Sequence, residues 1–240
     1  MKLVVAQWRM ELTNLVRNYE QLLLILVIPV GVLVFFGNVD VLPESMNLSR
    51  LVSSVLTLSL MSTAMVSTGI STGFERSYHV LKRLGVSPLG RTRLIWAKAG
   101  SVTVVELMQV LVLVIIATIL GWSATDASWW RVASALVLGT AAFAGIGLSL
   151  AGRLRAEANL AAQNGLYLVL LSIGGVIVPV GELPARLGNV AQYLPSGALA
   201  EVMYASLGGE SDSSLGAWIV LAVWAVVAPF AAARLFRFDG

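Results

Sequence analysis

Six long runs of apolar residues limit what this chain can fold into. A transmembrane α-helix needs about 20 mostly apolar residues, because the hydrocarbon core offers no water to an exposed backbone. Of its 240 residues, 58% are hydrophobic and 12% are charged, whereas a soluble domain has about 25% charged residues. The sequence predicts an all-α membrane protein with six transmembrane helices in a single domain, residues 1–240. The runs lie at about 21–37, 51–73, 99–121, 132–152, 161–180 and 215–234.

The Lys and Arg residues indicate how these helices are oriented. Six spans place both termini on one face of the membrane, together with the connecting segments 74–98 and 153–160. That face holds all but three of the 16 Lys and Arg residues, the exceptions being Arg50, Arg131 and Arg186. Since Lys and Arg concentrate in cytoplasmic loops, we expect both termini in the cytoplasm. An aromatic belt at the opposite interface is expected from Trp122, Trp129 and Trp130.

Residues 1–19 are predicted to form an amphipathic helix before the first span. Its apolar residues recur at helical spacing, and its charged residues lie off that stripe. This pattern suits a helix lying in the cytoplasmic membrane interface. A soluble amphipathic helix packed on a partner is the alternative. The apolar stripe consists of Val4, Trp8, Leu12, Leu15 and Tyr19.

The segment from Phe74 to Gly100 concentrates six Lys and Arg residues, with Glu75 as its one acid. Residues 74–84 are predicted to form a helix that leaves the membrane, because Gly85 suits a helix stop. A short helix with an apolar ridge can insert into a groove on another protein. A basic loop that only fixes topology and contacts anionic lipid is the alternative. The ridge consists of Val80, Leu81 and Leu84.

This segment reads E-R-x-x-x-x-L-K-R-L-x-x-S-P, with Lys98 ten residues after the proline. It resembles the cytoplasmic signature of the ABC-2 type permeases, the membrane subunits of type V ATP-binding-cassette exporters, drug exporters among them. In that family the segment is the coupling helix that docks on the nucleotide-binding subunit. Tyr78 and His79 stand where the family often has Gly, so docking details can differ. The resemblance implies docking contacts at Glu75, Arg76, His79, Leu81, Lys82, Leu84, Ser87 and Pro88.

The resemblance continues through the second half of the chain. The fourth span is rich in small residues and ends near a charged turn, in GTAAFAGIGLSLAGRLRAEANLA. Asn164 and Pro179 match features of the family's fifth span. Leu183, Pro184 and Pro195 match an extracellular re-entrant segment. We therefore expect short re-entrant helices over residues 182–208 that cap the exit. In that segment we expect Tyr193 and Met203 to face the membrane or the path, and Glu201 to be paired or solvated at the outer interface.

The chain lacks the residues of a catalytic or nucleotide-binding protein. No G-x-x-x-x-G-K-[ST] occurs, so ATP and its Mg are expected on a separate subunit. With no cysteine and one histidine, thiolate and His-cluster metal sites are not expected. No enzyme activity or nucleic-acid partner is expected of this chain. The resemblance implies two ATPase subunits and a second permease, identical or related, in a bacterial plasma membrane.

Polar residues inside the spans are candidates for the translocation path or its gate. Glu106 lies eight residues after Lys98, which places it about 12 Å along a helix and inside the bilayer. Gln109 shares its face one turn later. Asn164, beside Gln163, opens the fifth span. For Glu106 and Gln109 the alternative is a structural polar pair that bonds a neighbouring helix, whereas for Asn164 a bond between helices is the favoured role and the path is the alternative. The hydroxyl-rich second span can bond its own backbone.

The sequence therefore favours the permease subunit of an ATP-driven exporter of an amphipathic drug, natural product or lipid-like substrate. A hydrophobic cavity with only a few acids, as expected from this composition, argues against a strongly anionic cargo. One alternative is an ion-driven secondary carrier with Glu106 as a proton relay, although no inverted repeat is visible. The other alternative is a membrane regulatory or assembly subunit that transports nothing.

Overall fold

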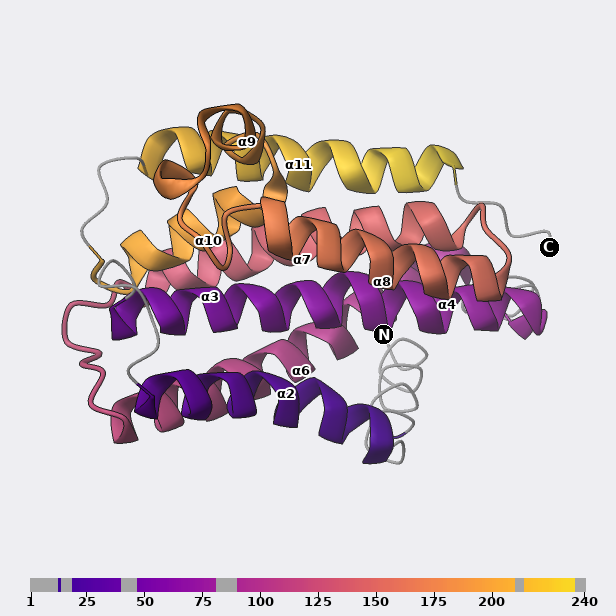
Figure 1. The fold of residues 1–240 in the computed structure, drawn as a ribbon. Coiled ribbons are helices and arrows are strands. Elements are labelled where there is room, and N and C mark those ends of the chain that lie inside the picture. Colours follow the sequence, from indigo (N-terminus) through magenta and orange to yellow (C-terminus); the bar gives the residue numbers. More distant parts are fainter. Residues whose placement is uncertain (1–12, 14–18, 40–46, 81–89, 210–213, 236–240) are drawn as a thin grey trace.

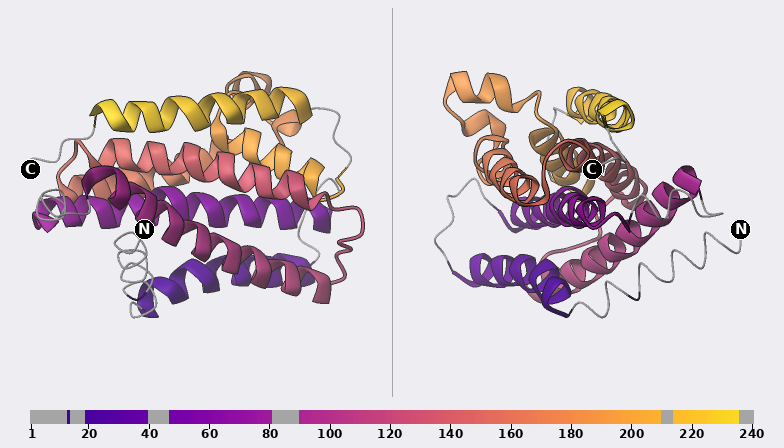
Figure 2. Two further views of the ribbon diagram at one scale, coloured as in Figure 1. Left: turned by 180° about the vertical axis from the view of Figure 1, so that it is seen from behind. Right: turned by 90° about the vertical axis from the view of Figure 1, so that its right-hand side faces the viewer.

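The computed structural model describes residues 13, 19–39, 47–80, 90–209 and 214–235, and every element in these residues is helical. Figure 1 shows α3 with α4, α7, α8 and α11 lying lengthwise beside one another, with α2 and α6 along one side. Figure 2 shows the same bundle from behind and from one end. The predicted interfacial helix, 1–19, lies almost entirely outside the described residues and stays a prediction.

The second predicted span is one long helix through the middle of the bundle. It consists of α3 (Leu48–Met61), a π-helical turn η1 (Ser62–Ser67) and α4 (Thr68–Ser77). Of the 18 most apolar consecutive residues in this helix, 78% are buried, so protein rather than lipid surrounds it. As predicted, hydroxyls of α3 bond their own helix: Ser53 and Thr57 donate to backbone carbonyls three and four residues earlier, both at 2.8 Å.

The helices α7 (Trp129–Ala151) and α11 (Ser214–Leu235) approach closely at a glycine. A Cβ on Gly145 would overlap the backbone around Ala228 and Pro229. Because Gly145 has no side chain, the two backbones can come together here, as small residues allow between transmembrane helices. The close contact at Gly145 therefore fixes α11 against α7.

Four described helices are long and apolar enough to cross a membrane. They are Leu48–Ser77, Gly100–Ile119 of α6 (Gly90–Ile119), Trp129–Ala151 and Leu215–Leu235. α2 (Tyr19–Asn38) contributes a shorter apolar stretch, Ile25–Asn38. The predicted fifth span, 161–180, has the wrong bounds. Its helix is α8 (Ala156–Ile173), which ends before Gly174 and a left-handed Gly175 with φ of 77°.

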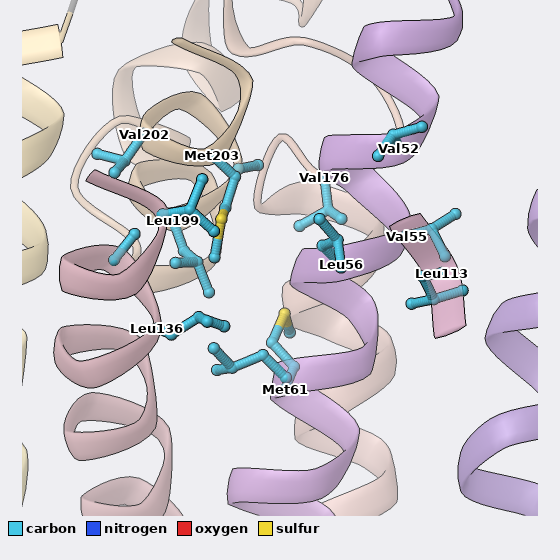
Figure 3. Close-up of a cluster of buried hydrophobic side chains, with 14 of the residues drawn as sticks. Val52, Val55, Leu56, Met61, Leu113, Leu136, Val176, Leu199, Val202 and Met203 are labelled. Atoms are coloured by element: carbon cyan, nitrogen blue, oxygen red, sulfur yellow. The ribbon is translucent and has the colours of Figure 1, made fainter. Parts of the chain in front are cut away.

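Short helices follow α8, as predicted for residues 182–208. They are η2 (Val180–Glu182), α9 (Ala185–Ala191) and α10 (Pro195–Ser206). Figure 3 shows Leu199 and Met203 of α10 pointing into the same apolar cluster as Leu56 and Met61 of α3. Met203 is fully buried there, so the expectation that it faces the membrane or the path is wrong. α10 is instead part of the core.

The three tryptophans of the predicted aromatic belt divide into two groups. Trp129 and Trp130 are exposed at the start of α7, where the predicted aromatic belt needs them. Trp122 is only 5% exposed and belongs to the apolar core, so its place in that belt is wrong. Its backbone N–H donates to Ala117, which folds the chain back at the end of α6 and turns the indole inward.

Candidate functional site: the coupling end and the buried polar residues

The helix that begins the predicted coupling segment, residues 74–84, ends earlier than predicted. α4 ends at Ser77, and His79 has a left-handed backbone with φ of 57°. A residue with a positive φ ends a right-handed helix, and histidine adopts a positive φ more often than most side chains do. The prediction of one helix over 74–84 is therefore wrong, and the chain turns at Tyr78 and His79. The remaining predicted docking residues lie outside the described residues: Leu81, Lys82, Leu84, Ser87 and Pro88.

Arg76 of the predicted signature binds the chain itself. Its Nη1 donates to the carbonyl of Gly152, and its Nη2 donates to the carbonyl of Leu154 at 2.8 Å. Both carbonyls belong to the turn between α7 and α8 (Figure 1). A planar guanidinium reaches the two carbonyls with two separate nitrogens in a rigid fork, whereas lysine would have to reach both with a single nitrogen on a flexible stem. Arg76 therefore fastens this turn to the last turn of α4, next to the half-buried Glu75.

Two amides of α8 bind the backbones of neighbouring helices at the same end. Asn159 Nδ2 donates to Gly69 O of α4 at 2.9 Å, and Gln163 Nε2 donates to Gly147 O of α7 at 2.8 Å. Gln163 also donates to Asn159 Oδ1 at 3.2 Å. Both side chains are fully buried. The pair joins α4, α7 and α8 into one block.

Three glycines make this amide contact possible. A Cβ on Gly69 would overlap the Gln163 amide, and one on Gly73 would overlap the Asn159 amide. A Cβ on Gly147 would stand 2.6 Å from the carbonyl oxygen of Met65. Each side chain would push α8 or the π-helical turn away. The sequence contained this signal: amides four residues apart on α8, and glycines four residues apart on α4.

Glu106 and Gln109 share a buried face of α6, as predicted, and each reaches a different neighbour. Glu106 Oε2 accepts from Thr140 of α7 at 2.6 Å. Its other oxygen, Oε1, has no hydrogen-bond partner within the part of the chain that the structure describes. At 3% exposed, Glu106 is enclosed by protein rather than open to a wide path in this structure.

Gln109 uses both ends of its amide. Its Oε1 accepts from Thr63 in the π-helical turn at 2.9 Å, and its Nε2 donates to Ile25 O of α2 at 3.0 Å. Ile25 O lacks its ordinary partner because the residue four positions on, Pro29, has no N–H. Gln109 replaces that missing donor and thereby ties α2, α6 and η1 together.

Among the described residues Asn164 makes no bond to another helix, although the sequence predicts one. Its Nδ2 donates to Leu160 O of its own helix at 3.0 Å, and the side chain is exposed. Gln163, one residue earlier, makes the inter-helix bonds instead. One residue corresponds to about 100° around a helix, so the two amides point to different sides of α8.

The comparisons with known proteins agree with these features. Residues 37–234 match the family model described as "ABC-2 family transporter protein". The chain is also similar to "Putative transport permease YvfS" of Bacillus subtilis (strain 168), with 23% identity over 190 residues, which is 78% of each chain. The family match extends from the end of α2 to the last turn of α11 and includes every inter-helix tie described above except the Ile25 end of the Gln109 bridge. The chain belongs to the ABC-2 family of membrane transporter proteins.

Proposed function

We propose that this chain is the permease subunit of an exporter driven by ATP that a separate subunit hydrolyses. The observation that supports it most is the fastening of the α7–α8 turn to the end of α4 by Arg76. α4 leads directly into the basic signature segment. A partner that pushes on this segment would move α4, the turn and α8 together, because Asn159 and Gln163 join the same helices.

The proposed topology has six spans and both termini in the cytoplasm. α4, α7 and α11 end on the side of Figure 1 at which α8 begins, and this side carries the basic α7–α8 turn. Arg153 and Arg155 are exposed in that turn, and Arg234 is exposed in the last turn of α11. A positively charged end of the bundle is expected to face the cytoplasm. α2 and α8 supply the first and fifth spans.

A second permease, identical or related, would pack against the outer face of α8. Asn164, Gly165 and Ser172 are exposed there, and a Cβ on Gly165 would meet nothing within 4 Å. An exposed amide and small residues suit a protein neighbour better than lipid. α8 also exposes the apolar Leu160, Leu168 and Val169, so its outer face is mixed. The exposed side chains of α11 are mainly large and apolar, as lipid contact requires: Leu215, Ile219, Val223, Val226, Val227 and Phe230.

The substrate in this proposal is an amphipathic drug, natural product or lipid-like molecule. Asn164 would line the path or the surface between two permeases. Glu106 and Gln109 would act as gate residues, because their bonds to α7, η1 and α2 must rearrange if these helices separate. The ATPase subunit would be present in two copies and would carry ATP and Mg.

Co-purification in detergent tests this proposal. A stoichiometric P-loop ATPase should remain bound, and the complex should hydrolyse ATP. Leu81→Asp and Leu84→Asp should each weaken the complex about tenfold, because a charge would enter an apolar groove. Leu187→Asp is the control, since Leu187 is exposed on α9 at the other end of the bundle. A chain that purifies alone and keeps its transport activity in both variants contradicts the proposal.

The second candidate is an ion-driven carrier, and it is favoured by Oε1 of the buried Glu106, which has no hydrogen-bond partner among the described residues. A carboxyl group with one free oxygen inside a membrane protein can take up and release a proton. Proteoliposomes of the chain alone distinguish the two. Transport that follows a pH gradient and stops in Glu106→Gln would support the carrier, whereas dependence on an added ATPase and ATP would exclude it.

A further inference from the structure

An ion pair between the buried Arg50 and the mostly buried Glu201 joins α10 to the start of α3. Arg50 Nη2 contacts Glu201 Oε1, and the two side chains are 5% and 17% exposed. The ring of Tyr204 lies 4.7 Å from the Arg50 guanidinium carbon. Asn47 caps the first turn of α3 by accepting from Arg50 N at 2.8 Å and also contacts the Tyr204 hydroxyl at 3.4 Å. One charged contact thus brings together both helices.

The rest of α10 is held by contacts without charge. Leu199, Val202 and Met203 enter the apolar cluster of Figure 3. At the other side a Cβ on Gly197 would stand 2.6 Å from Gly174 O, so α10 lies directly on the end of α8. Apolar residues could have made the α3 contact as well, since a buried ion pair is seldom more stabilising than an apolar pair of equal size.

An ion pair differs from an apolar contact in how it opens. When apolar side chains separate, water reaches them and the free energy gained by burial is lost. When two charges separate, each regains hydration, which offsets part of the lost attraction. The contact between α3 and α10 therefore suits two helices that are packed together in one conformation and separated by water in another. Under the proposed topology this contact lies at the outer end, because Arg50 is one of three basic residues away from the cytoplasmic face.

We propose that Arg50 and Glu201 form a latch that holds α10 shut against α3 at the outer end of the transport path. This inference rests on the proposed transport function and topology. The two residues act as positioning residues: they hold α10 on α3 and contact no substrate in this proposal. Release of the latch would expose the face of α10 that is buried in the closed state.

Thiol labelling can follow this movement, because the chain has no native cysteine. Ser206→Cys introduces a thiol at a site on α10 that is 1% exposed. Intact cells are treated with a membrane-impermeant maleimide. Arg50→Gln and Glu201→Gln should each raise the labelling rate at least about tenfold, since one charge is left buried and unpaired. The exchanged pair Arg50→Glu with Glu201→Arg should restore protection.

Two controls separate topology from the latch. Thr125→Cys, exposed in the α6–α7 connection, should react in intact cells in every background. Arg153→Cys, exposed in the α7–α8 turn, should react only after permeabilisation. The reverse pattern would overturn the proposed topology. The labelling rates at position 206 would then be compared in permeabilised cells, where the maleimide reaches the other face. Equal labelling at position 206 in the native pair and both single variants would overturn the latch.

A second measurement tests movement without weakening the protein. In the complex with its co-purified ATPase, with Arg50 and Glu201 intact, Ser206→Cys should react faster during ATP turnover than with ADP. A purely structural ion pair would leave the two rates equal, and that result would overturn the latch even if the single variants fold poorly. Arg50→Lys, which keeps the charge, should behave like the native pair.

Discussion

The α4 end and the α10 end of the bundle are fastened by different chemistry. At the α4 end, Arg76, Asn159 and Gln163 donate to backbone carbonyls, and glycines bring the helices close enough for this. At the α10 end, side chains of opposite charge meet. At the α4 end only the donor side chain can rotate away, because the carbonyl is fixed in its helix, whereas at the α10 end both partners are side chains that can rotate. In the proposed mechanism the α4 end would therefore move as one block, and the α10 end would open.

The largest effect should come from filling a glycine at the α4 end. Gly147→Ala places a Cβ 2.6 Å from the Met65 carbonyl oxygen, where only helix backbone could give way. We expect a loss of about 3 kcal/mol or more, at the upper end for an overpacked core because only backbone can move, measured by thermal unfolding in detergent. Gly165→Ala is the matched control in a helix with open space, and should gain up to about 1 kcal/mol. Equal behaviour of the two would show that the contact is loose.

Removing the two-carbonyl contact of Arg76 should have the next largest effect. Arg76→Gln loses charge-assisted bonds to Gly152 and Leu154, at about 1.5–3 kcal/mol, and Arg76→Lys should lose roughly half of this. Arg153→Gln is the control, because that side chain is exposed. ATP hydrolysis per transported substrate should also rise in Arg76→Gln, since the push would no longer reach the α7–α8 turn. An unchanged ratio would limit Arg76 to a role in stability.

The Arg76 contact also shows where sequence reasoning reached its limit. Apolar runs predicted the helices, and the spacing of Glu106 and Gln109 predicted their shared face, because both depend on local periodicity. The partner of Arg76 is a pair of carbonyls 76 and 78 residues away, and every residue has a carbonyl, so no residue type marked it. The sequence therefore predicts a docking contact at Arg76, which stays a prediction, and gives no sign of the intramolecular contact that the structure adds.

The same reasoning explains the errors on α8 and at His79. Asn164 and Gln163 are both amides, and which of them turns inward depends on how α8 is rotated against glycines from two other helices. Single-residue polarity does not carry this information. At His79 the backbone turns with a positive φ although the residue is not glycine. The first glycine that could mark the helix end, Gly85, lies six residues further along the chain, so the predicted helix is too long.

A smaller effect is expected at Gln109, which is midway between the two ends. Gln109→Leu leaves Ile25 O without a donor and should cost about 1–2 kcal/mol. In a Pro29→Ala background the new backbone N–H can bond Ile25 O, so the same change should cost about 1 kcal/mol less. A double-mutant cycle by thermal unfolding measures this coupling. Additive losses would mean that Gln109 does not replace the donor that proline removes.

The smallest effect on the single chain should come from Asn164, which binds only its own helix among the described residues. Asn164→Leu should change unfolding stability by less than about 0.5 kcal/mol. If α8 contacts a second permease, the same change removes an inter-helix polar contact and should weaken dimerisation roughly three- to tenfold. Fluorescence energy transfer between labelled chains in lipid measures this. Val226→Ala, exposed on α11, is the control and should leave dimerisation unchanged. Equal dimer affinity in both variants would move the contact surface away from α8, and the rigid block would then transmit its movement inside one chain only.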